Sequence, residues 1–108
     1  GVGINGAGCA DSFVLEFDKP VAWPVFARTM DTLIALRGPD LLRVKGLLAV
    51  EGCKGPVVVQ FVQHLAQQPT ELEAWPDDDR HGRVVFITRG IGKRQVSDLL
   101  AAVQGIAA

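Results

Sequence analysis

Two consecutive stretches decide the fold: LLRVKGLLAVEG, residues 41–52, and PVVVQFVQHL, residues 56–65. The first alternates along its length, which predicts a half-buried β-strand with two different faces. One predicted face carries Leu42, Val44, Gly46, Leu48 and Val50, and the other carries Arg43, Lys45, Leu47, Ala49 and Glu51. Gly46 suggests either the close approach of a helix or a bulge that redirects the strand.

The second stretch predicts the antiparallel partner of the first. The segment GCKGP between them is rich in turn-forming residues, and the short spacing favours a hairpin. On this strand Val57, Val59 and Phe61 share one predicted face, and Val58, Gln60, Val62 and His64 share the other. The hairpin therefore places Arg43, Lys45, Gln60 and His64 together on the less apolar face.

Towards the N-terminus, the sequence predicts a strand over residues 12–18 and a helix over residues 23–38. SFVLEFD alternates, and Pro20 ends the strand. In the helix, Pro24 suits the first turn, and Gly38 followed by Pro39 marks the end. One apolar stripe is formed by Phe26, Met30, Leu33 and Ile34.

Towards the C-terminus, PTELEAW (residues 69–75) predicts a fourth strand, residues 75–82 a polar loop and RVVFITRG (residues 83–90) a further strand. Because RVVFITRG is apolar on both faces, we expect a central strand covered on both sides or covered on one side by a partner. Val96, Leu99, Leu100 and Val103 indicate a final amphipathic helix. The order β-α-β-β-β-β-α predicts an α+β fold: an antiparallel sheet of four to five strands with both helices on one face, a ferredoxin-like two-layer sandwich.

Composition narrows the class of protein. The chain has 108 residues, of which 48% are apolar and 21% charged, as in an ordinary globular domain. A net charge of −1 provides no basic field for nucleic acid or anionic lipid, and no apolar run reaches the roughly 20 residues of a membrane span. Two cysteines, Cys9 and Cys53, are too few for a disulfide scaffold, so we expect a cytoplasmic protein. Residues 1–11 are glycine-rich and predict a flexible leader before a domain over residues 12–108.

Catalytic and metal-binding patterns are weak. The leader lacks the lysine and hydroxyl residue of a phosphate-binding loop, and neither His64 nor His81 lies in a nucleophile motif, so no catalytic or cofactor-binding residue is predicted. His64, His81 and Cys53 are the candidate metal ligands, although they lack paired spacing. Residues 77–79, all aspartates, are consecutive and more typical of a solvated turn than of a cation site.

The aromatic residues leave two alternatives open. Trp23 and Trp75 each precede a proline and would either anchor a partner or close an edge of the core. Phe61 and Phe86 could stack nucleic-acid bases on a sheet, but core packing explains them better.

The chain resembles the C-terminal domain of the CobW family of P-loop GTPases from about Ser12 to Val103. The resemblance rests on FDKP, ALRGPDLLRVKG, the VQH that ends the second stretch, WPDDDR and VFITRG together. It differs in Phe61, where the family commonly has a small residue, and in HLAQQP, which lacks the further histidines of many members. The first difference implies altered packing or an altered partner surface. The second makes a metal site in this domain less well supported.

The resemblance implies a function in a larger protein. Family members have an N-terminal GTPase domain that uses GTP and Mg²⁺ and serves delivery or insertion of metals such as zinc and cobalt, in some members for cobalamin synthesis. None of its motifs is in this chain. We therefore expect a non-catalytic accessory domain that modulates the GTPase domain of the same protein or docks a metalloprotein client. Arg43, Lys45, Gln60 and His64 are the candidate docking residues. The alternative is a domain that itself binds zinc or cobalt, and no nucleic-acid or membrane partner is expected.

Overall fold

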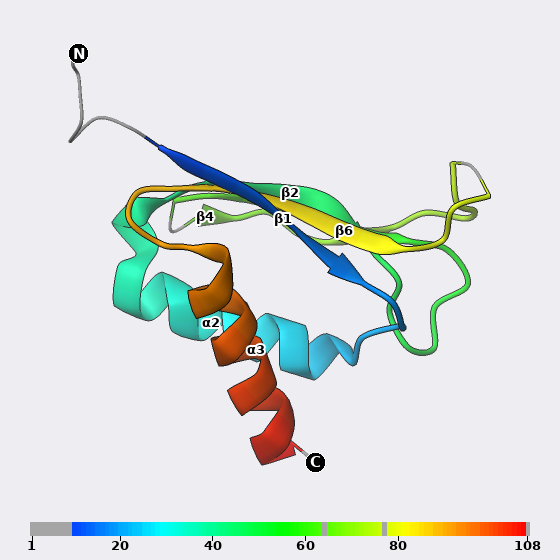
Figure 1. The fold of residues 1–108 in the computed structure, drawn as a ribbon. Helices are drawn as coiled ribbons and strands as arrows, with labels where there is room; N and C mark the ends of the chain where they lie inside the picture. The colour runs from blue at the N-terminus through cyan, green and yellow to red at the C-terminus, as the bar shows by residue number, and fades with distance from the viewer. Residues whose placement is uncertain (1–9, 64, 77, 108) are drawn as a thin grey trace.

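The computed structural model describes residues 10–63, 65–76 and 78–107, the last without its side chain. It confirms the predicted α+β class: a sheet forms one layer and two helices form the other (Figure 1). In chain order the elements are β1 (Asp11–Phe17), α2 (Trp23–Arg37), the 3₁₀ turn η1 (Gly38–Asp40), β2 (Leu41–Leu48), β3 (Val57–Val62), β4 (Leu65–Ala66), β5 (Thr70–Glu71), β6 (Gly82–Thr88) and α3 (Lys93–Ala107). Of the predicted leader, residues 1–9 lie outside the described residues, and Asp11 already belongs to β1.

The sheet has the strand order β1-β6-β2-β3-β4, and β5 also pairs with β3. All these pairs are antiparallel. The predicted hairpin is confirmed, because Lys45 lies opposite Gln60 and Val44 opposite Phe61. The predicted central position of the last long strand is also confirmed, since β6 lies between β1 and β2.

The predicted fourth strand is much shorter than expected. Thr70–Glu71 pairs with the start of β3, and a separate two-residue strand, Leu65–Ala66, pairs with its end. In the described part of the chain the sheet therefore has six strands, two of which are short pieces along the edge of β3. Leu72 N–H still donates to Pro56 C=O at 2.8 Å, but Pro56 has no N–H to return the bond, and residues 73–75 pair with no strand of the described chain.

Helix α2 begins and packs as its sequence predicts. Pro24 occupies the first turn, and Phe26, Met30 and Leu33 are buried against the sheet, with Ile34 partly buried. Its end differs from the expectation, because Gly38 has a right-handed φ of −48° and continues into η1. Helix α3 contacts α2 and β1, and Figure 1 shows it running away from the sheet towards the C-terminus.

The core lies between the sheet and α2. Its apolar side chains include Leu15, Phe26, Met30, Leu33, Leu41, Val44, Leu48, Val57, Val59, Phe61, Val84, Phe86, Ile91 and Val96. The rings of Phe13 and Phe86 stack with centroids 5.0 Å apart, so they extend this core to β1. The buried hydroxyl of Thr88 donates to the carbonyl of Ile91 at 2.6 Å and fixes the turn that leads to α3.

Two details of β2 correct the predicted pattern. Leu41 is fully buried whereas Leu42 is only partly buried, because the pairing with β6 shifts register between Leu41 and Arg43. Gly46 is explained neither by a helix nor by a bulge at its position. A Cβ atom there would collide with the carbonyl oxygen of Arg83 and lie 2.6 Å from the Cα of Val84, so the backbone of β6 requires the glycine.

Candidate functional site

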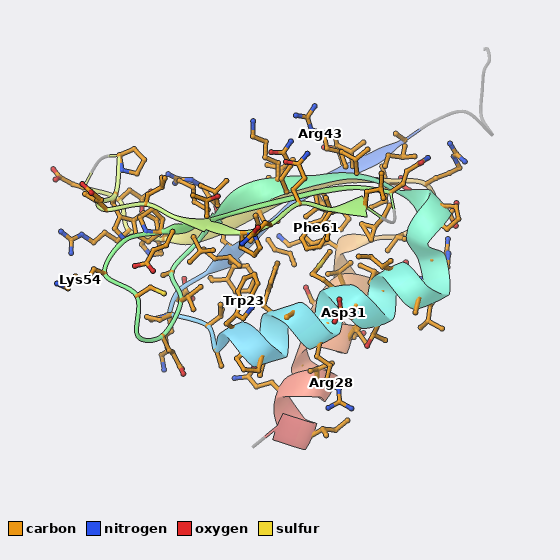
Figure 2. The ribbon with its side chains drawn as sticks, turned by 180° about the vertical axis from the view of Figure 1, so that it is seen from behind. Trp23, Arg28, Asp31, Arg43, Lys54 and Phe61 are labelled. Atoms are coloured by element: carbon orange, nitrogen blue, oxygen red, sulfur yellow. The ribbon has the colours of Figure 1, made fainter. Side chains whose placement is uncertain are left out.

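The face of the sheet opposite the helices is the candidate site, and we call it the open face. Its members share the outward side of β1, β2, β3 and β6 by strand alternation and register: Ser12, Val14, Glu16, Arg43, Lys45, Leu47, Val58, Gln60, Val62, Arg83, Val85 and Ile87. Figure 2 shows Arg43 pointing away from the helices and Phe61 pointing towards them. No helix of the described chain lies over this face (Figure 1).

The open face is more apolar than a surface in contact only with water requires. Val14, Val62 and Val85 expose 38%, 41% and 40% of their area. Leu47, Val58 and Ile87 are half-buried among them. A hollow of about 290 Å³ lies on this face, lined by Arg43, Lys45, Val85 and Ile87. A protein surface with an apolar centre and acidic margin would complement it.

Most of the predicted docking residues do lie together. Arg43 and Lys45 are exposed neighbours on β2, and Gln60 lies directly opposite Lys45 on β3. The position of His64 lies outside the described residues. The structure thus brings together three of the four candidates on one face.

The contribution of β6 to this face was not predicted from the sequence. Lys45 lies opposite Val85 and Arg43 opposite Ile87, so β6 supplies the apolar half of the hollow. Arg83 adds a third cation beside Leu47. The alternation within RVVFITRG was visible, but the neighbours of this strand follow only from the strand order.

At one end of the open face, the loop before β6 carries an ionic cluster. Asp79 accepts a hydrogen bond from Arg83 Nη1 at 2.8 Å, and His81 Nδ1 lies 2.7 Å from its other carboxylate oxygen. The backbone N–H of His81 also donates to Asp79 at 3.0 Å. Hydrogen bonds from His81, together with Arg83, hold the pKa of Asp79 well below its usual range, and bonding to this carboxylate raises the pKa of His81. This cluster fixes the orientation of Arg83.

Of the three candidate metal ligands, Cys53 and His81 belong to the described residues, whereas His64 lies outside them. Cys53 lies half-buried after β2, and burial, followed by the charge of Glu71 and a hydrogen bond to it, raises the pKa of its thiol. His81 is instead engaged with Asp79. Within residues 10–63, 65–76 and 78–107, no three His, Cys, Asp or Glu side chains lie close enough to hold a metal ion together.

The burial of the aromatic side chains bears on the alternative roles considered for them. Phe61 and Phe86 lie in the core, on the helix side, so they offer no stacking platform. The departure of Phe61 from the family pattern therefore affects core packing. Trp23 packs beside Phe26 at 5.8 Å between ring centroids, and the half-buried Trp75 lines a groove of about 270 Å³ with Cys53.

The helices α2 and α3 have 15 residues each. No helix in the described part of the chain is long and apolar enough to cross a membrane.

Comparison with known proteins covers nearly the whole domain. The family model described as "Cobalamin synthesis protein cobW C-terminal domain" matches residues 10–104. The Zinc chaperone YjiA of Escherichia coli strain K12 is 29% identical over 93 residues, which are 86% of this chain and 29% of the relative. Two solved structures, the Zn(II)-bound YjiA GTPase from E. coli and a Zn(II)-bound triple mutant of YjiA GTPase, each have a TM-score of 0.76 at 29% identity, and each match covers 87% of this chain and 29% of that one. The chain therefore spans 29% of the length of the relatives it matches.

Proposed function

This chain belongs to the CobW C-terminal domain family, and on that premise we propose that it is a non-catalytic accessory domain of a GTP-dependent metallochaperone. We further propose that the open face docks onto the GTPase domain of the same protein and modulates it. Zinc is the cargo best supported for the complete protein, since the matched relative is named a zinc chaperone. A cytoplasmic location remains part of the proposal.

The observation that carries the proposal is the mixed character of the open face. Valines of β1, β3 and β6 that expose 38–41% of their area share this face with the cations of Arg43 and Lys45 on β2. An antiparallel sheet with one face in water normally alternates apolar-in and polar-out. Contacts between domains of one chain are commonly mixed polar and apolar, as this face is.

A tethered domain is a better match for this face than a separate client. Binding to a domain in the same polypeptide proceeds at an effective concentration in the millimolar range for a short flexible linker. A modest face with few fully apolar positions is then sufficient for a stable contact. A metalloprotein client docking on the same face is the competing outcome of the experiment below.

The first step is to measure the mass of the native polypeptide that contains this domain. An immunoblot of source cells with an antibody against this domain should give a band much larger than 11.6 kDa. A native polypeptide of 11.6 kDa would leave no GTPase domain in the same chain, and the proposal would be wrong.

The separately produced GTPase domain of that protein is then titrated with this chain by calorimetry. The double variant Arg43→Glu, Lys45→Glu should weaken binding at least roughly tenfold, because it reverses two charges at the hollow. The matched control Arg28→Glu, Arg94→Glu makes the same charge change on the two helices, where Figure 2 shows Arg28 on the side away from the sheet. Equal binding by both double variants would contradict docking through the open face, and GTP hydrolysis measured in the same samples tests modulation.

A further inference from the structure

The two edges of the sheet differ in how far other strands pair with them. At the β3 edge, both β4 and β5 pair with β3 and cover its ends. At the opposite edge, the seven-residue strand β1 pairs with β6 and, in the described part of the chain, with no other strand. A long unpaired edge is a template for a further strand.

The direction of the β6 backbone identifies which groups of β1 are unpaired. The carbonyl oxygen of Arg83 lies against Gly46 of β2, and the N–H of Arg89 donates to the carbonyl of Asp40 at 2.7 Å. Successive residues of a strand direct their backbone groups to opposite sides. The odd-numbered residues of β6 therefore face β2, and Val84 and Phe86 face β1.

The same alternation applies to β1. Phe13 and Leu15 lie opposite Phe86 and Val84, so their N–H and C=O groups face β6. The N–H and C=O groups of Ser12, Val14 and Glu16 therefore point away from the sheet. The strand sequence DSFVLEF contains none of the lysine or proline residues that protect edges, and its pairing with β6 runs without a register shift.

We propose that the β1 edge pairs with β1 of a second copy of this chain, antiparallel and centred on Val14. In this register Val14 lies opposite Val14 of the second copy, and Ser12 lies opposite Glu16. All three residues then exchange both backbone hydrogen bonds with the second copy. On the helix side, Leu15 of the second copy lies opposite the half-buried Phe13.

The sequence of β1 is self-complementary in this register and less so in others. The hydroxyl of Ser12 faces the carboxylate of Glu16, and no two like charges are directly opposite. A shift by one residue would place Asp11 opposite Asp18 and put the two helical layers on opposite sides of the joined sheet. A shift by two residues would lose one of the three outward-facing pairs. These constraints favour a second copy over an unrelated extended segment.

The space beside β1 suits a second copy. A groove of about 700 Å³ lies beside the carboxyl end of β1. It is lined mainly by residues 16–25, which run from the end of β1 to the start of α2, and α3 contributes Leu100 and Gln104. It exists because α3 runs away from the sheet (Figure 1). The start of the second β1 would lie above this groove, and the open faces of the two copies would form one continuous surface.

Sedimentation equilibrium of the whole chain tests the proposal. At protein concentrations up to about 1 mM the mass should rise from 11.6 kDa towards twice that value. Val14→Lys should abolish this rise, because it places two cations at the symmetry axis. The control Val62→Lys changes a valine of similar exposure, 41% against 38%, far from the β1 edge and should leave the rise unchanged. A constant mass of 11.6 kDa, or equal loss in both variants, would overturn the proposal.

Cross-linking gives a second measurement that does not depend on the lysine variant remaining folded. Opposite residues in a hydrogen-bonded antiparallel pair have Cα atoms about 5.5 Å apart, within the range of a disulfide. With Cys9→Ser and Cys53→Ser as background, Val14→Cys should form a covalent dimer on oxidation several times faster than Val62→Cys. Equal rates would exclude pairing about Val14.

Discussion

The two faces of the sheet are made by the same strands but differ in how deeply their side chains are buried. On the helix side, Val44, Val59 and Val84 are at most 1% exposed. On the open face, Val14 and Val85, whose Cα atoms are directly opposite, expose about 40% each (38% and 40%). Burial fixes the shape and volume of the first set, whereas we expect the second set to accept a charged side chain without loss of the fold. If the helix-side face carries the stability of the fold, the open face is left available for the proposed docking, and the following predictions test that division.

The largest difference is expected between Phe86 and its neighbour Val85. Phe86→Ala removes a fully buried ring that stacks on Phe13 and should cost about 3–5 kcal/mol of unfolding free energy. Val85→Ala removes an exposed side chain and should cost less than about 1 kcal/mol. Urea denaturation of both variants measures this, and similar losses would show that the open face also stabilises the fold.

Gly46 should be nearly as sensitive as the core. Gly46→Ala places a Cβ against the backbone of β6, which cannot move without separating the strands, and should cost roughly 1–3 kcal/mol. As a control, Gly105→Ala adds a methyl group where nothing lies within 4 Å, and it should stabilise α3 by a few tenths of a kcal/mol up to about 1 kcal/mol. A neutral or stabilising effect of Gly46→Ala in thermal unfolding would refute the close packing of β2 on β6.

A smaller loss is expected at Thr88. Thr88→Val removes the buried hydroxyl that donates to Ile91 and should cost about 1 kcal/mol. Thr32→Val removes a hydroxyl that donates to Arg28, but water replaces this exposed bond, so its effect should be close to zero. Chemical denaturation of both variants compares the two hydroxyls, and a larger loss at Thr32 would contradict the assigned burial.

The smallest effect concerns the ionic cluster and depends on pH. The pKa of His81 is raised above its usual 6.5 by Asp79, so the charged histidine contributes stability below about pH 6.5 that is lost as pH rises through the folded-state pKa. His81→Gln should therefore lower the melting temperature near pH 5.5 and have little effect near pH 9. An NMR titration of His81 that gave a pKa at or below 6.5 would argue against the pair.

Much of the fold could be predicted because it depends on short-range periodicity. The alternation of residues 43–48 and 57–62 predicted both faces of the hairpin, and the stripe from Phe26 to Leu33 predicted the buried side of α2. The positions of Arg43, Lys45 and Gln60 on one face followed from the same alternation. The family resemblance found in the sequence is confirmed over residues 10–104.

Other features could not be predicted, because they depend on which strands become neighbours. The pairing of Lys45 with Val85 places an apolar strand beside a basic one and so creates the hollow of the open face. The requirement for Gly46 arises from the backbone of β6, far away in the sequence.

By itself, then, the sequence determined where strands and helices form and which side of each is apolar, because hydrophobic periodicity acts over a few residues. Only the tertiary structure decided which two strands flank the central β6, that two short strands cover the β3 edge and that β1 is left as an edge. These outcomes depend on long-range backbone pairing and on packing of α2 across the sheet, which no local pattern specifies.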